Sequence, residues 1–189
     1  MYIAIEGIDT AGKSTQIAAL KEHFTDAIIT KEPGGTAIGA EIRELVLSAR
    51  AQSRRAEFLL FLADRAEHVA EVIEPNLDKM IISDRSAVSG VAYALTQDEI
   101  SKKELVELND FATKKIYPQK VFLLRLTKEE LEFRLSQKEL DGIELRGSAY
   151  LLKIQDSIIE AAKLLGIELI EIDATLPKES ITQKILSYL

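Results

Sequence analysis

The stretch EGIDTAGKST at residues 6–15 constrains this chain most, because its glycines, lysine and serine have the spacing of a phosphate-binding P-loop. The apolar run MYIAI precedes it, and after it Ile17, Leu20 and Phe24 recur at helical spacing. The motif therefore lies between a predicted strand and a predicted helix, as a P-loop requires. A glycine-rich turn without a ligand is the alternative, and we favour the P-loop because every fixed position of the motif matches.

The P-loop predicts a nucleotide site. Backbone N–H groups of residues 8–14 can surround phosphate oxygens at the helix N-terminus. Lys13 is expected to neutralise the β- and γ-phosphates, and the Ser14 hydroxyl to bind Mg²⁺. Asp9 either stabilises the turn or lies near Mg²⁺ or the acceptor phosphate, and we favour the second role. The loop residues of the predicted ATP site are Gly7, Ile8, Asp9, Thr10, Ala11, Gly12, Lys13, Ser14 and Thr15.

Composition narrows the functional classes. The chain has 189 residues, 47% of them hydrophobic, which fits a single α/β domain over residues 1–189. It has no cysteine, which excludes disulfides and thiolate metal sites. A net charge of −7 argues against a nucleic acid polymer as partner. A helix needs about 20 consecutive apolar residues to span a bilayer, and no apolar run here is close to that length. We therefore expect a soluble cytoplasmic protein without a membrane partner.

Five apolar runs predict the strands of a sheet, at residues 2–6, 27–30, 80–83, 121–126 and 168–172. Helical patterns separate these runs, which favours a doubly wound five-stranded parallel sheet flanked by helices. Because each run is nearly all apolar, we expect every strand to be buried on both faces. Ligands of such sheets bind at the carboxyl ends of the strands, so the residues after each run are candidates for the site.

The second run and the helix before the third supply acceptor candidates. Glu32 follows the second run, and Arg43 lies on the next helix, where a solvated charge is the alternative. Residues 58–62 are apolar on all helical faces, which predicts a deeply buried helix start. Phe61 and Arg65 share a helix face, so this ring and guanidinium could bind the face and edge of a base. A core phenylalanine with an arginine at the rim is the alternative.

The third and fourth runs supply further charged candidates. Asp84 closes the third run at the Walker B position and could hold Mg²⁺ through water, beside Ser14. Capping of the next helix is its alternative role. Arg85 follows it toward the same crevice. After the fourth run, Thr127 is a predicted N-cap with Glu130 completing a capping box. His23 and His68 have no partner at metal-binding spacing, so both are predicted to be ordinary helix residues.

A charged segment at about 136–147 is the predicted lid, and Arg134, Lys138 and Arg146 are its candidate cations. A solvated surface segment is the alternative. A P-loop, a strand-end aspartate and lid cations together predict phosphoryl transfer by positioning and charge stabilisation. A phosphate monoester as acceptor is ionised at neutral pH, since its second pKa is about 6, and needs no general base. A kinase for AMP, UMP or a non-nucleotide acceptor and a nucleotide-hydrolysing switch remain alternatives, although no guanine-reading Asn-Lys-x-Asp string occurs.

The segments EGIDTAGKSTQ, EPGGT, FLADR, DRSAVSGVAY and IDAT resemble, in this order, the thymidylate kinase family of bacterial type. The resemblance runs from residue 2 to about 175. It implies transfer of the γ-phosphoryl group of ATP to dTMP, giving dTDP for dTTP synthesis. It also implies a fold like that of P-loop nucleoside monophosphate kinases, dependence on Mg²⁺, and a homodimer.

The same resemblance implies roles for individual residues. Phe61 would stack on thymine and Arg65 would contact its edge, while Asp173 and Ala174 would lie near the adenine. The remaining acceptor residues would be Asp9, Glu32, Arg43, Arg85, Ser89, Gly90 and Tyr93. The catalytic charges would be Asp9, Lys13, Arg85, Arg134, Lys138 and Arg146. The chain departs from the family pattern at Thr10, Ser86, Ser136 and Gly142, where relatives place an arginine or, at position 86, an aromatic residue or histidine.

Overall fold

The computed structural model describes residues 1–48, 52–137, 139 and 144–189. In this part of the chain, five parallel strands form one sheet in the order β2-β3-β1-β4-β5. The strands are β1 (Tyr2–Glu6), β2 (Ile28–Lys31), β3 (Ile81–Asp84), β4 (Lys120–Arg125) and β5 (Glu168–Asp173). The predicted parallel sheet is therefore confirmed, with strand ends within two residues of the expected ones.

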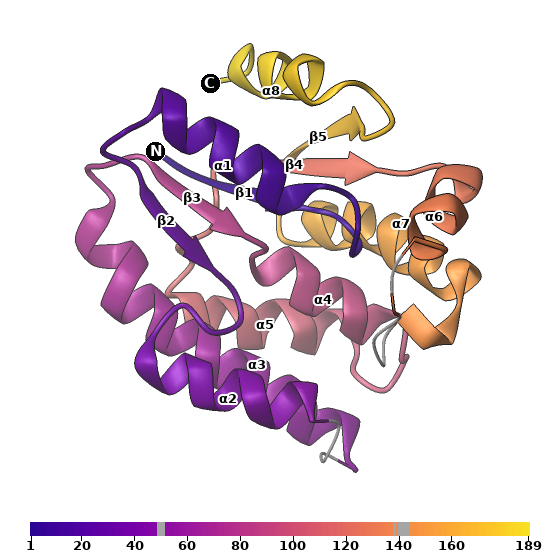
Figure 1. Ribbon diagram of the computed structural model, residues 1–189. Coiled ribbons are helices and arrows are strands. Elements are labelled where there is room, and N and C mark those ends of the chain that lie inside the picture. The colour runs from indigo at the N-terminus through magenta and orange to yellow at the C-terminus, as the bar shows by residue number, and fades with distance from the viewer. Residues whose placement is uncertain (49–51, 138, 140–143) are drawn as a thin grey trace.

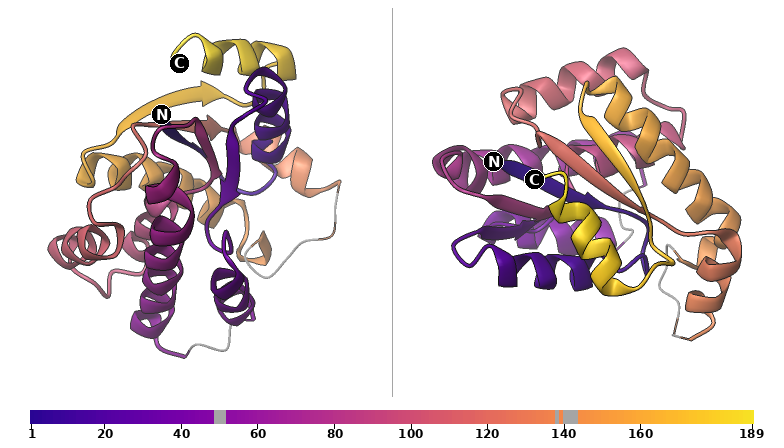
Figure 2. Two further views of the ribbon diagram at one scale, coloured as in Figure 1. Left: turned by 90° about the vertical axis from the view of Figure 1, so that its left-hand side faces the viewer. Right: turned by 90° about the horizontal axis from the view of Figure 1, so that it is seen from above.

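Helices cover both faces of this sheet (Figures 1 and 2). They are α1 (Lys13–His23), α2 (Ala37–Leu47), α3 (Arg54–His68), α4 (Ala87–Leu95), α5 (Lys102–Thr113), α6 (Lys128–Leu135), α7 (Ser148–Leu164) and α8 (Lys178–Leu186). Figure 1 shows α1 and α8 on one face and α3, α4, α5 and α7 on the other, while α2 packs against α3. No helix in the described part of the chain is long and apolar enough to cross a membrane.

Two expectations about burial were wrong in part. The central strands β1, β3 and β4 are largely buried, but β2 is only half-buried and β5 alternates between buried and exposed residues. These two strands are the edges of the sheet, where the layers of helices cover them less completely. At the start of α3, Phe58 and Leu62 are buried but Leu59 is 56% exposed. The helices α2, α4 and α5 pack against α3, and Leu59 lies on the side of α3 that these helices leave exposed.

Candidate active site

The P-loop connects β1 to α1 at the carboxyl edge of the sheet. Gly7 has a φ of +149°, and a Cβ there would lie 2.9 Å from the Leu124 carbonyl oxygen, so only glycine fits. Lys13 Nζ donates to the Ile8 carbonyl oxygen over 3.2 Å and lies 3.6 Å from Oδ1 of Asp9. Burial, and next the like charge of Arg85, lowers the pKa of Lys13 to about 8. A polyphosphate would supply the negative charge that stabilises this buried ammonium.

Two cavities adjoin this loop. The first has a volume of about 260 Å³ and is lined by apolar, aromatic and charged side chains. The second has a volume of about 450 Å³ and is lined mainly by P-loop residues with Asp84. Both are lined by Asp9, Glu32, Arg43 and Arg85. The four charged side chains therefore mark a boundary at which groups bound in the two cavities would meet.

Every predicted acceptor residue lines the first cavity. These residues are Asp9, Glu32, Arg43, Phe61, Arg65, Arg85, Ser89, Gly90 and Tyr93. Of the predicted ATP residues, Asp9, Thr10, Gly12, Lys13, Ser14 and Thr15 line the second cavity. Three further loop residues do not line the cavity: Gly7, Ile8 and Ala11. The carbonyl oxygen of Gly7 accepts a hydrogen bond from Arg85, and that of Ile8 accepts one from Lys13. The sequence did not indicate that Arg54, Glu57 and Gln97 also line the first cavity.

Arg85 lies at the boundary in a constrained conformation. Its Nη2 donates to Oδ1 of Asp9 over 2.8 Å, and its Nη1 donates to the Gly7 carbonyl oxygen over 3.0 Å. Its backbone has a φ of +68°, which costs about 1 kcal/mol or more in a residue other than glycine. The Ser83 hydroxyl, which donates to the Arg85 carbonyl oxygen over 2.7 Å, helps to hold this turn. Although burial raises the pKa of Asp9, Arg85 and Lys13 outweigh it and hold this pKa below its ordinary value.

Arg65 is buried, contrary to the rim position of the alternative interpretation, whereas Phe61 is half-buried beside the cavity. The Nε of Arg65 donates to Oε1 of Glu32 over 2.5 Å, and its Nη1 donates to Oδ1 of Asn109 over 2.7 Å. A Cβ at Gly90 would lie 2.7 Å from Nη2 of Arg65, so glycine there leaves room for the guanidinium. Burial alone would raise the pKa of Glu32. Arg65 and then His68 outweigh burial and hold this pKa below its ordinary value, so the carboxylate stays ionised.

Arg43 reaches the boundary from α2. Its Nη1 donates to the Pro33 carbonyl oxygen over 3.0 Å, and a Cβ at Gly34 would lie only 2.9 Å from its Cδ. The EPGGT loop thus lies directly against the arginine stem. Thr36 accepts a hydrogen bond from the Gly39 N–H over 2.9 Å, so it is the predicted N-cap of α2. Arg43 is therefore a cavity residue and not simply a solvated helix charge.

The second cavity has donors that fit Mg²⁺. Ser14 and Asp84 both line it, and Oδ1 of Asp84 is buried without a hydrogen-bond partner among the described residues. A carboxylate oxygen in this state is a suitable ligand for a hard cation. The described residues contain no group of three or more histidine, cysteine, aspartate or glutamate side chains that could hold a metal. A magnesium ion here would therefore take most of its ligands from nucleotide phosphates and water.

Arg134 joins the P-loop to the loop after β5. Its Nη1 donates to the Thr10 carbonyl oxygen over 2.9 Å, and its Nη2 donates to that of Ala174 over 2.8 Å. Its Nε donates to Oε1 of Glu130 over 2.6 Å. Thr127 is the predicted N-cap of α6, but the Glu130 carboxylate binds Arg134, so the predicted capping box was wrong. The structure thus brings Arg134 and Ala174, two of the predicted ATP-site residues, to the P-loop.

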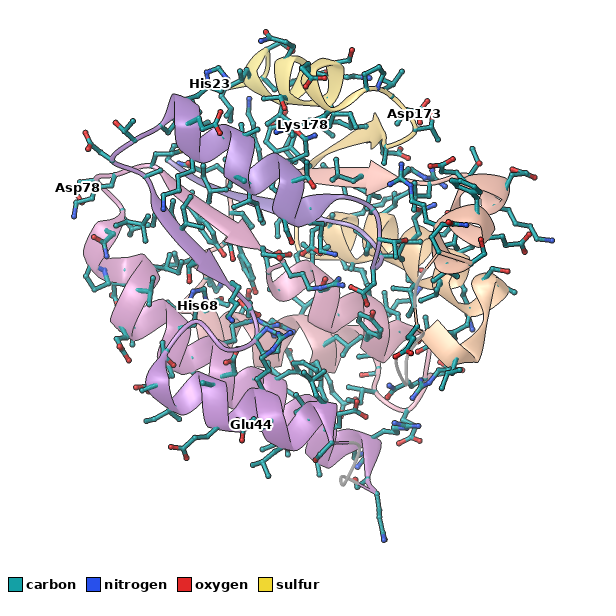
Figure 3. All side chains as sticks on the ribbon, viewed as in Figure 1. His23, Glu44, His68, Asp78, Asp173 and Lys178 are labelled. Carbon is teal, nitrogen blue, oxygen red and sulfur yellow. The ribbon has the colours of Figure 1, made fainter. Side chains whose placement is uncertain are left out.

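The other lid candidates are placed differently. Arg146 Nη1 donates to the Tyr150 hydroxyl over 3.0 Å, and its guanidinium lies 5.1 Å from the centre of that ring. It lies outside both cavities as the described residues define them. Lys138 and Gly142 are outside the described residues. Asp173 ends β5 (Figure 3), where its Oδ1 accepts hydrogen bonds from the backbone N–H and hydroxyl of Thr175.

Several buried polar residues behind the cavities were missed from the sequence. Glu6, at the end of β1, accepts hydrogen bonds from the Ser86 hydroxyl over 2.9 Å and the Ser89 hydroxyl over 2.5 Å. Burial raises its pKa, although Arg85 and these serines oppose the shift. His68 was predicted to be ordinary, yet it is fully buried beside Glu32. The sequence offered two signals for these residues. Glu6 is a lone glutamate in an apolar strand, and His68 follows Arg65 by three residues on the same helix.

Comparisons with known proteins identify the family of this chain. The family model described as thymidylate kinase matches residues 5–185. The thymidylate kinase of Sulfurimonas denitrificans is 73% identical over 99% of this chain and 98% of its own, and that of Wolinella succinogenes is 56% identical over 99% and 97%. The crystal structure of thymidylate kinase from Ehrlichia chaffeensis superposes with a TM-score of 0.76, at 25% identity over 100% of this chain and 97% of that one. A family match over almost the whole length, on a fold with a P-loop beside an aromatic cavity, shows that this chain belongs to the thymidylate kinase family.

Proposed function

We propose that the two cavities divide the two substrates of the thymidylate kinase reaction, with dTMP in the first and the phosphates of ATP in the second. The chain is an ATP-dependent dTMP kinase that gives dTDP. This assignment of the substrates rests on the boundary that both cavities share, which consists of Asp9, Glu32, Arg43 and Arg85. A phosphoryl group transferred between the cavities would cross this boundary.

In the first cavity, the proposed contacts follow from shape and charge. Phe61 stacks on the thymine ring, and the buried Arg65 donates to the edge of the base, as its pairing with Glu32 and Asn109 favours. Arg43 and Arg85 bind the phosphate monoester at the boundary. Tyr93 lies beside the deoxyribose, where its bulk excludes a 2′-hydroxyl.

The chemistry is positioning with charge stabilisation. An ionised oxygen of dTMP forms a bond to the γ-phosphorus as the bond to the bridging oxygen of ADP breaks, and the negative charge passes to ADP. Lys13 stabilises that charge, while Arg85 holds the acceptor phosphate in line. No general base is needed, because the acceptor has lost its proton at neutral pH. Ser14 and Asp84 would hold Mg²⁺, which when bound neutralises phosphate charge.

We also propose that residues 1–189 form one kinase domain whose lid is at about 136–147. Arg134 is the lid cation that the described contacts favour, because it already touches the P-loop. We further propose that the protein acts as a homodimer in the cytoplasm. Exposed apolar side chains on neighbouring helices support a second copy as partner: they are Ile38, Leu45, Leu59 and Phe111, the last 85% exposed.

A coupled ADP-release assay tests the substrate assignment. ATP and Mg²⁺ are mixed with dTMP, dUMP, UMP, AMP or no acceptor. Strong turnover with dTMP and little in the no-acceptor control is the expected result. A Phe61→Ala variant should raise KM for dTMP about tenfold or more with little change for ATP, since it removes the stacking surface. Equal effects on both substrates would contradict the division between the cavities.

A further inference from the structure

We propose that His68 is a positioning residue of the acceptor site, which acts through Glu32 to hold the Arg65 guanidinium against the base of the nucleoside monophosphate. This inference rests on the proposed function, in which Arg65 contacts the thymine edge. His68 itself lines neither cavity as the described residues define them, so it acts only through its neighbours.

The imidazole of His68 lies between β2 and α3. The residue ends α3, is fully buried, and is labelled below β2 in Figure 3. Its Nε2 lies 2.7 Å from the Thr30 hydroxyl, and its Nδ1 lies 3.6 Å from Oε2 of Glu32. Among the described residues, Nδ1 has no hydrogen-bond partner within ordinary distance. A buried polar nitrogen of this kind is costly unless it faces a group that it attracts.

The surroundings favour one tautomer of His68. A carboxylate can only accept a hydrogen bond, whereas a threonine hydroxyl can donate one. A proton on Nδ1 points at Glu32, and Nε2 then accepts from Thr30. The opposite tautomer would set the Nδ1 lone pair against the carboxylate, which is repulsive. A ring with its proton on Nδ1 therefore attracts Oε2 of Glu32.

The two oxygens of Glu32 face different partners on one helix face. Oε1 accepts from Arg65, and Oε2 faces His68, three residues further along α3. This arrangement restricts rotation of the carboxylate and so fixes where the Arg65 donors lie. The loop after β2 covers the ring, because a Cβ at Gly35 would lie 2.7 Å from Cδ2 and 2.9 Å from Nε2 of His68. His68 thus connects Glu32, the loop and Arg65.

A pair of matched variants tests which nitrogen matters. His68→Asn keeps an amide N–H near the position of Nδ1, while His68→Gln places it near Nε2. His68→Gln should raise KM for dTMP about tenfold, because the electrostatic attraction that restrains the Glu32 carboxylate is lost. KM for ATP and kcat should change less than about threefold, and His68→Asn should restore most of the dTMP affinity. Calorimetric titration with dTMP in the absence of ATP should rank the dTMP affinities of the wild type and the two variants in the same order.

Equal effects of the Asn and Gln variants, or an unchanged KM for dTMP in His68→Gln, would overturn the inference. If His68→Gln does not fold, Thr30→Val replaces it, since losing the hydroxyl removes the donor that sets the tautomer, and KM for dTMP should again rise. In a Glu32→Gln background, His68→Gln should add less than about twofold, because both act through one carboxylate. Additive effects would show that Glu32 is not the intermediary.

Arg65→Lys separates this inference from the proposed function. If Arg65→Lys raises KM for dTMP while both His68 variants leave it unchanged, the acceptor site stands and the role of His68 falls. If Arg65→Lys leaves KM for dTMP unchanged, the proposed base contact is wrong and the inference falls with it. Melting temperatures measured for each variant identify any that is not folded at the assay temperature.

Discussion

Asp9 and Arg85 meet over 2.8 Å at the boundary between the two cavities, although one lies in the P-loop and the other follows β3. The same arginine also donates to the Gly7 carbonyl oxygen, so its guanidinium is bound to the P-loop at two points. An acceptor phosphate that binds Arg85 is thereby aligned with the loop that holds the donor. We therefore propose that Asp9 acts by positioning the Arg85 guanidinium, which would account for a carboxylate beside a phosphate site.

Asp9→Asn should lower kcat/KM for dTMP about tenfold to a hundredfold, because Arg85 loses a charged partner in a partly buried site. KM for ATP should change much less. Initial rates at varied dTMP and ATP measure both effects. Asp156→Asn removes the exposed carboxylate that pairs with Arg125 and is the matched control. An Asp9 variant with wild-type kcat/KM would mean that the Asp9–Arg85 contact is not used in the reaction.

Lys13→Met should abolish turnover and yet raise the melting temperature, because it removes a buried ammonium whose folded-state pKa is about 8. The unfolded lysine has a pKa near 10.5, so between pH 8 and 10.5 the unfolded state binds more protons and wild-type stability rises with pH. The stability advantage of Lys13→Met should therefore shrink over this range. Urea unfolding at several pH values measures it, and a pH-independent difference would contradict the shifted pKa.

Asp64→Asn should change the pH dependence of stability at the acidic side. Burial raises the pKa of Asp64 to about 6, while the Gly34 N–H, which donates to it over 2.8 Å, opposes the shift. The folded state then binds more protons than the unfolded state between about pH 4 and 6, so this group lowers stability as the pH rises. The free energy of unfolding of Asp64→Asn should improve relative to wild type across that window. Asp26→Asn, which removes an exposed carboxylate, is the matched control.

Arg134→Lys should lower kcat/KM for ATP about tenfold or more, because a lysine cannot bridge the Thr10 and Ala174 carbonyl oxygens with separate nitrogens. Arg146→Ala should have a small effect, since that side chain is bound to Tyr150. Steady-state kinetics with varied ATP compare the two. The reverse order of effects would assign the lid charge to Arg146.

Tyr93→Ala should weaken discrimination against ribonucleotides, because the ring lies in the first cavity beside the proposed sugar position. Burial raises the pKa of Tyr93 to about 12, so the phenol is neutral, and we expect it to discriminate by its bulk. The ratio of kcat/KM for dUMP to that for UMP should fall about fivefold or more, a loss of about 1 kcal/mol of discrimination. Tyr93→Phe should keep the wild-type ratio. An unchanged ratio in Tyr93→Ala would place the selectivity elsewhere.

Local sequence patterns were enough to predict the sheet, the P-loop and most of the residues at the cavities. Apolar runs separated by helical patterns specify a parallel α/β sheet, and this topology brings the ends of β1, β2 and β3 to one edge. Asp9, Glu32 and Arg85 each lie within three residues of the end of one of these runs, which predicts that their side chains lie near one another. Periodicity and motif spacing carry this information because they depend on neighbours along the chain.

Which charges are buried, and which partners they take, depends instead on the packing of distant segments. Arg65 is buried because Glu32 and Asn109 come to it from other elements, and no local pattern encodes contacts across 33 and 44 positions. Arg134 and Arg146 have similar sequence surroundings, yet one binds the P-loop and the other stacks on Tyr150. His68 likewise gains its environment from Thr30 in β2 and from Glu32 just after that strand. Burial and charge pairing arise only when such segments meet, and the order of residues along one helix or strand does not specify that meeting.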